Sequence, residues 1–113
     1  MSRRRPPPQP WKPADATDFI RAIARDENLH LATTRHCRQR LGERNLITGD
    51  LLHVPRRGHV YEDPQPSTNP EFCKYGMEST TPNSHGRCLR VVVIPDPASR
   101  CLKAVTVMWI DEG

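Results

Sequence analysis

The spacing of apolar residues changes character at about residue 59 of this chain. Before that point apolar residues recur three or four positions apart, which predicts helices, and after it they gather in short β-branched runs, which predict strands. The segment 29–33 alternates only weakly, so it is either a short extended segment or a loop. The helices are expected over 14–27, from Thr33 or Thr34 to Arg44, and from Thr48 to Pro55.

The second half of the chain predicts a meander of short strands separated by turns. Helices followed by strands indicate an α+β fold, with two to three N-terminal helices packed on one face of a small antiparallel β-sheet meander. Regular alternation would put Lys103 and Thr106 on opposite faces of the last strand. The strands are expected at 59–62, 72–78, 88–94 and 102–110, joined by turn-rich segments at 63–70, 80–86 and 95–99.

The length of 113 residues suits one domain with one modest core. We expect residues 1–12 to be a disordered, basic, proline-rich tail and residues 13–113 to form a single domain. No apolar run is long enough for a transmembrane helix, and no apolar stretch follows the first arginines as in a secretory signal. The four cysteines show no C-x-x-C spacing, so we expect no metal site, reduced thiols and a cytoplasmic protein.

Charge adds a first functional indication. The formal net charge is +4, and fourteen of the seventeen basic residues are arginine. The planar arginine fork matches phosphate oxygens, so this bias favours a nucleic-acid partner. A genome that prefers arginine codons would produce the same bias without any such function.

The basic residues are concentrated in the second predicted helix. His36, Arg40 and Arg44 lie four apart and form one stripe, next to an apolar stripe of Cys37 and Leu41 that we expect to face the core. The segment holds too few acidic residues to pair with all these cations. The stripe is therefore either a phosphate-binding surface or a solvated helix face.

A histidine among arginines suits metal-independent cleavage of RNA. Near neutral pH, His36 can exchange protons with a reacting strand, while cations stabilise charge on the phosphorane. On the strand at 72–78, Lys74 could hold a phosphate, and Tyr75 could act through its hydroxyl, stack on a base or simply pack in the core. Arg57 forms a basic corner with a glycine, and Arg90 interrupts an apolar strand and must emerge on the open face of the sheet.

The order of these segments resembles a family of small prokaryotic proteins classed as a domain of unknown function. It also resembles the RelE-type ribonuclease toxins, and its start is similar to the MqsR toxins. The resemblance covers about residues 12–110. It rests on Lys12-Pro13, Thr33-Thr34-Arg35, His36-x-x-x-Arg40-x-x-x-Arg44-Asn45-Leu46, Gly49-Asp50-Leu51-Leu52, Arg57-Gly58 and Lys74-Tyr75-Gly76.

This resemblance implies a RelE-like α+β fold and an endoribonuclease toxin of a toxin–antitoxin module. Such a toxin cleaves mRNA without a metal or other cofactor, and a cognate antitoxin, often one with a zinc-finger domain, neutralises it. The glutamine expected in the active site has no clear match in this sequence. The expected catalytic residues are His36, Lys74 and Tyr75, and the expected RNA-binding residues are Arg40, Arg44, Arg57 and Arg90.

Two alternatives remain open at the level of sequence. The chain could be a non-catalytic RNA- or protein-binding module on the same fold, because a fold does not establish an activity. It could also be a structural protein whose arginine stripe docks on an acidic protein surface. A helix-turn-helix is disfavoured, because the third predicted helix is short, apolar and ends in proline.

Overall fold

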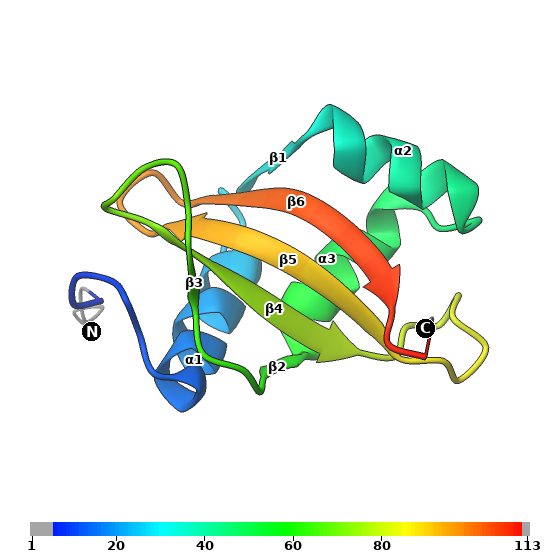
Figure 1. Cartoon of the computed structure of the whole chain (residues 1–113), viewed down its shortest axis with the longest axis horizontal. Helices are drawn as coiled ribbons and strands as arrows, with labels where there is room; N and C mark the ends of the chain where they lie inside the picture. Colours follow the sequence, from blue (N-terminus) through cyan, green and yellow to red (C-terminus); the bar gives the residue numbers. More distant parts are fainter. Residues whose placement is uncertain (1–5, 112–113) are drawn as a thin grey trace.

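The computed structural model describes residues 6–111, so the predictions for residues 1–5 and 112–113 lie outside it. Within this range the chain forms three helices and six strands (Figure 1). The α+β class expected from the sequence is confirmed. The elements are α1 (Pro13–Ala24), β1 (His30–Thr33), α2 (Arg35–Glu43), α3 (Thr48–Arg57), β2 (His59–Val60), β3 (Gln65–Pro66), β4 (Cys73–Ser79), β5 (Leu89–Asp96) and β6 (Cys101–Trp109).

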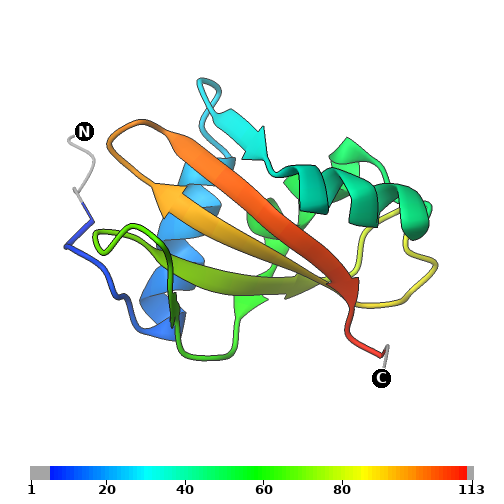
Figure 2. The same ribbon diagram turned by 45° about the horizontal axis from the view of Figure 1, so that its top comes forward.

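The sheet is mixed, so the prediction of an antiparallel meander was wrong in part. Its strand order is β1-β6-β5-β4-β2, with β3 paired to β4 off this path. The pairs among β2, β3, β4, β5 and β6 are antiparallel, but β1 runs parallel to β6. The His30 N–H bonds to the Arg100 carbonyl at 2.9 Å and the Thr34 N–H to the Ala104 carbonyl at 3.1 Å. Figure 2 shows β1 running beside β6 directly into α2.

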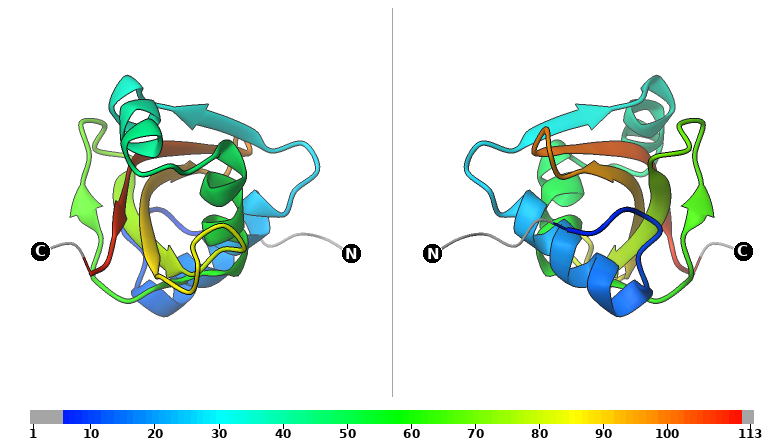
Figure 3. Two further views of the ribbon diagram at one scale, coloured as in Figure 1. Left: turned by 90° about the vertical axis from the view of Figure 1, so that its right-hand side faces the viewer. Right: turned by 90° about the vertical axis from the view of Figure 1, so that its left-hand side faces the viewer.

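The helices α1 and α3 pack together behind the sheet, and no helix of the described chain covers the opposite, outer face (Figure 1). The segment that contains β3 lies on that outer side, away from α3 (Figure 3). Alternate residues of β5 are buried, including Leu89, Val91 and Val93, so one face of this strand forms the floor of the core. The helix α2 packs chiefly on β6, with Cys37 and Leu41 buried.

Two helix ends differ from the prediction. The first helix ends at Ala24 rather than at residue 27. The third helix passes through Pro55 and ends at Arg57. Proline fixes a φ angle that a helix accepts, and here only the last turn follows it, so the helix continues to the Gly58 N–H, which bonds to the Val54 carbonyl at 2.7 Å.

A β-bulge in β6 changes which side chains share the outer face. The register shifts between Val92 and Val93 of β5, so that Lys103 pairs with Ile94 while Thr106 pairs with Val92. Residues two apart on β5 point to the same side, and their partners therefore do so too. The prediction that Lys103 and Thr106 lie on opposite faces was wrong, because the extra residue of the bulge shifts the alternation of side chains and places both on the same face.

The folded unit begins before Pro13. Trp11 is buried, and its ring stacks on Tyr75 with centroids 5.5 Å apart. The side-chain amide of Gln9 accepts from the Cys73 N–H at 2.7 Å and donates to the Pro95 carbonyl at 3.0 Å. The Gln9 amide therefore bridges a donor of β4 and an acceptor of β5.

Candidate functional site

The polar face of α2 carries a row of four interacting side chains. The helix begins where the Thr34 hydroxyl accepts from the Cys37 N–H at 3.0 Å, which identifies the N-cap among the two threonines proposed. The Arg40 Nε lies 3.4 Å from the His36 Nε2, and another Arg40 nitrogen lies 2.7 Å from the Glu43 carboxylate. The predicted stripe of His36, Arg40 and Arg44 therefore forms one surface, which we call the α2 row together with Glu43.

Glu43 joins the two arginines of the α2 row. Its Oε1 is 2.7 Å from Arg40 and 3.5 Å from Arg44. Hydrogen bonds from Arg40 and then from the Gln39 amide hold the pKa of the Glu43 carboxyl below its usual range. Sequence reasoning treated Glu43 only as an insufficient counter-charge. Its i, i+3 spacing from Arg40 was the signal that could have revealed the contact.

Tyr75 is a core residue. Its side chain is 1 % exposed, and its hydroxyl accepts a hydrogen bond from the Trp11 N–H at 3.0 Å. Burial raises the pKa of Tyr75 to about 12, so the phenol stays protonated at neutral pH. One of the roles considered for Tyr75 was packing in the core, and the structure shows the ring there with its hydroxyl hydrogen-bonded.

Lys74 lies next to Tyr75 on β4 and on the opposite face, as strand alternation predicts. The α2 row borders β6, which is separated from β4 by β5. His36, Lys74 and Tyr75 thus belong to three different environments: the exposed side of α2, the outer face of the sheet and the core. The structure does not bring these three residues together.

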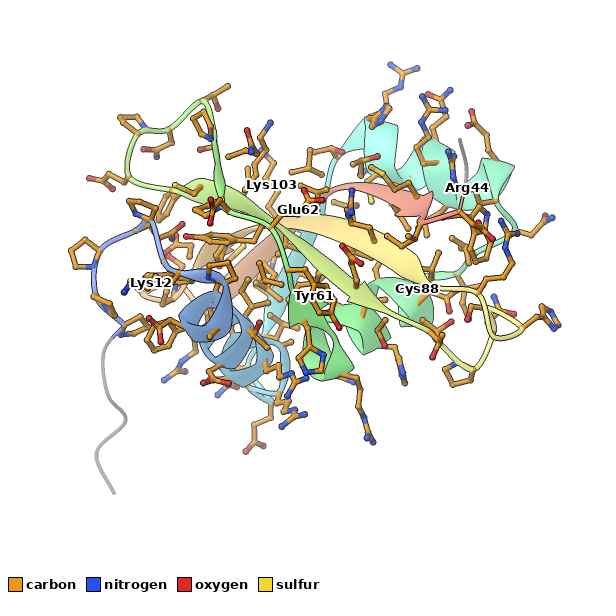
Figure 4. The ribbon with its side chains drawn as sticks, turned by 60° about the horizontal axis from the view of Figure 1, so that its bottom comes forward. Lys12, Arg44, Tyr61, Glu62, Cys88 and Lys103 are labelled. Carbon is orange, nitrogen blue, oxygen red and sulfur yellow. The ribbon has the colours of Figure 1, made fainter. Side chains whose placement is uncertain are left out.

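Arg90 emerges on the outer face of the sheet, where the sequence placed it, and its guanidinium is held by two carboxylates. It lies 2.9 Å from Glu78 of β4 and 3.2 Å from Glu62. The side chain crosses β4 above Gly76, where a Cβ would come within 3.1 Å of the Arg90 Cδ. Figure 4 shows Glu62 above the sheet and Arg44 near α2. Sequence reasoning missed both carboxylates, which lie in separate segments.

Arg57 lies at the end of α3, remote from the α2 row. Its carbonyl accepts from an Arg21 nitrogen at 3.0 Å, and its own side chain is exposed. Gly58 follows because the backbone is crowded there: a Cβ would lie 2.6 Å from the Val54 oxygen and 2.7 Å from the Glu78 oxygen. The four arginines predicted to bind RNA therefore occupy three surfaces.

Asp50, from the Gly49-Asp50-Leu51-Leu52 motif, is a buried clamp. Its carboxylate accepts from the Ile47 N–H at 2.8 Å, the Thr81 hydroxyl at 2.7 Å and the Asn83 amide at 3.1 Å. Burial alone would raise the pKa of Asp50, but these three hydrogen bonds outweigh it and leave that pKa lowered. The clamp fixes the turn-rich segment 80–86 to the start of α3.

The four cysteines form no disulfide with one another. Within residues 6–111, no three histidine, cysteine or acidic side chains gather as a metal site would require. In the same range, no helix combines the length and the apolar character needed to cross a bilayer.

The fold and the α2 row define a small α+β protein with a basic helix exposed at one side of a mixed sheet. A family model described as "Domain of unknown function (DUF4258)" matches residues 33–109, and the chain belongs to this family. The match begins at the last residue of β1 and ends with β6, so it includes α2 and β2 to β6. No curated protein and no solved structure matches the chain.

Proposed function

We propose that this protein binds RNA at the α2 row and cleaves it without a metal, as an endoribonuclease toxin does. The observation that carries this proposal is the contact series His36–Arg40–Glu43–Arg44, in which the Arg40 and Glu43 side chains are 38 % and 43 % exposed and that of Arg44 is 16 % exposed. It combines a proton carrier, a carboxylate and two guanidiniums, which are the groups that cleavage at a ribose 2′-hydroxyl needs. The relation to RelE-type and MqsR-like toxins is part of the same proposal.

The chemistry assigns one role to each side chain. Arg40 and Arg44 hold the scissile phosphate and stabilise the added negative charge of the phosphorane. The Glu43 carboxylate accepts the proton of the attacking 2′-hydroxyl, and the His36 imidazole delivers a proton to the departing 5′-oxygen. The products are a strand ending in a 2′,3′-cyclic phosphate and a strand with a free 5′-hydroxyl.

Cleavage of a single-stranded RNA by the purified protein, with a chelator present, tests this proposal. We expect His36→Ala to lower the cleavage rate by about 10²–10⁴-fold and Glu43→Gln to lower it as well. Tyr75→Phe is the matched control: the variant lacks the buried hydroxyl yet should cut at the wild-type rate. No cutting by wild-type protein would exclude the nuclease, and loss of activity only in Tyr75→Phe would move the chemistry away from α2.

A second candidate is a non-catalytic RNA-binding module. It is favoured by the separation of His36, Lys74 and Tyr75, which leaves the α2 row without the lysine and tyrosine expected from the toxins. In that case RNA would bind with strong salt dependence, Arg40→Ala would weaken it, and His36→Ala would leave the RNA intact and the affinity nearly unchanged. Flat salt dependence would instead favour an acidic protein partner.

The toxin proposal includes a cytoplasmic location and an antitoxin protein, which could carry a zinc-finger domain. Both are implied by the resemblance to the toxins. Expression of wild-type protein should arrest growth, and co-expression of the antitoxin should relieve the arrest. Equal growth of cells expressing wild type and His36→Ala would count against a toxin.

A further inference from the structure

A second basic cluster lies where α1 and α3 end, at the far end of α3 from α2. It consists of Arg21, Arg25, Arg56, Arg57 and His59, and we call it the α1–α3 cluster. Ten residues of helix span about 15 Å. The cluster adjoins β2, whereas the α2 row adjoins β6, and β5 and β4 lie between these strands. It is therefore a surface separate from the α2 row.

Backbone carbonyls, rather than carboxylates, hold the arginines of this cluster. Arg21 donates to the Gly58 carbonyl at 2.8 Å and has a nitrogen 3.0 Å from the His59 ring. Arg25 donates to the Arg56 carbonyl at 2.7 Å, and Arg56 donates to the Ala24 carbonyl at 2.9 Å. These bonds satisfy helix ends and fix the guanidiniums in place, but a carbonyl does not cancel their charge.

Arg38 likewise donates to a carbonyl, that of Thr33 at 2.9 Å, but several other arginines lie beside carboxylates. Arg40 lies beside Glu43, Arg87 beside Asp111, and Arg90 beside Glu62 and Glu78. No ion pair is seen for the four arginines of the α1–α3 cluster within residues 6–111. Carbonyls fix the guanidiniums of Arg21, Arg25 and Arg56, and the exposed Arg57 lies at the same helix end, so the cluster is a positive surface whose complement is a polyanion.

An exposed aromatic ring beside the cluster narrows the class of polyanion. Tyr61 is 65 % exposed, although large aromatic side chains are usually buried. Its ring centroid lies 5.9 Å from that of His59, and the two planes are inclined by 32°. Figure 4 shows Tyr61 on the face turned toward the viewer. A bare aromatic ring next to fixed arginines suits an unpaired base attached to a phosphate backbone.

We propose that the α1–α3 cluster and Tyr61 form a binding site for single-stranded nucleic acid. The arginines contact successive phosphates, and a base stacks on the Tyr61 ring. An acidic protein would use the same charges, but its carboxylate side chains have no flat aromatic face to stack on the ring as a base does. The site does not depend on cleavage at α2, so this inference and the proposed function can fail separately.

Fluorescence anisotropy with a labelled oligouridine RNA of about 12 nucleotides tests the proposal. Tyr61→Ala should raise the Kd about tenfold, while Tyr61→Phe, which keeps the ring, should bind as wild type does. Arg57→Ala should weaken binding and lower the slope of log K against log salt by about 0.7. The matched controls are Ile47→Ala, which removes another exposed apolar side chain, and Lys12→Ala, which removes an exposed cation elsewhere.

The outcomes are distinct because both tested side chains are exposed and no described contact of the fold uses the Arg57 side chain. An unchanged Kd in Tyr61→Ala and Arg57→Ala would overturn the proposal. So would equal affinity for polyglutamate and RNA together with no effect of Tyr61→Ala. Loss of binding in Arg40→Ala alone would assign all RNA contact to α2 and overturn it too. The same oligonucleotide as DNA tells whether the site requires RNA.

Discussion

Thr34, Asp50 and Tyr75 show which features of single residues could be predicted from the sequence and which could not. A threonine cap at Thr33 or Thr34 was predictable because threonine is a preferred N-cap residue, and the structure selects Thr34. In the sequence Asp50 stood out only as part of the Gly49-Asp50-Leu51-Leu52 motif. Two of its three hydrogen-bond partners, Thr81 and Asn83, lie more than thirty residues later in the chain. Local pattern does not encode such partners. Tyr75 was ambiguous for the same reason, since burial depends on Trp11, from a segment expected to be disordered.

Asp50 should be a major determinant of stability at neutral pH. Asp50→Asn keeps the shape but weakens the acceptor for the Ile47 N–H and the Thr81 hydroxyl, so we expect a loss of about 1–3 kcal/mol in unfolding free energy. Urea denaturation at pH 7 measures it. Asp63→Asn, at an exposed carboxylate, is the control and should change the free energy by less than about 0.5 kcal/mol.

The pH dependence of the same variant checks the charge of Asp50. The folded pKa is lowered, so the stabilisation is present above the unfolded pKa of about 3.9 and is lost as pH falls through the folded value. The difference in unfolding free energy between wild type and Asp50→Asn should therefore shrink below about pH 4. A difference independent of pH would mean that the carboxylate charge is not the source.

At the scale of elements, residue propensities predicted most helices and strands, but they could not predict which strands pair with one another. The run Cys88–Ile94 was recognisable as a strand because of its β-branched residues. The short segment His30–Thr33 becomes a strand only because β6 accepts it as a parallel edge partner. The bulge near Val105 is equally non-local, since it depends on the register of β5 against β6. These features decide which side chains share the outer face.

Two glycines should respond oppositely to alanine. Gly58→Ala places a Cβ against backbone oxygens of α3 and β4, so we expect a loss of about 1–3 kcal/mol or more. Gly42→Ala meets no atom within 4 Å and lies in α2, where alanine favours the helix by up to about 1 kcal/mol. Thermal unfolding of both variants compares the two effects. A stable Gly58→Ala protein would show that α3 and β4 can separate there.

At the scale of the whole molecule, charge is distributed over distinct surfaces. From the sequence, His36 and Lys74 were expected to be catalytic and Arg57 and Arg90 to bind RNA. The fold assigns them to α2, to the outer face of the sheet and to the end of α3. The net charge and the arginine content still favour a polyanionic partner, but the basic residues do not form a single site. The spacing of these residues along the chain could not predict that they lie on separate surfaces of the fold.

Residues 6–12, which we call the N-terminal arm, contact β4 and β5 through Gln9. Gln9→Ala leaves the Cys73 N–H and the Pro95 carbonyl without this partner, so we expect a loss of about 1–3 kcal/mol in unfolding free energy. Urea denaturation measures it, with Gln65→Ala as the control because the Gln65 side chain is exposed on β3. Equal stability of the two variants would show that water replaces the Gln9 amide without cost.

The position of Gln9 also has a consequence for the order of folding during synthesis. Gln9 leaves the ribosome before its partners, which follow 64 and 86 residues later. The hairpins β4–β5 and β5–β6 join neighbouring segments, so they can form before the arm docks. During synthesis Trp11 therefore lacks its stacking partner Tyr75 until β4 has been made, and docking of the arm is a late event that completes the core.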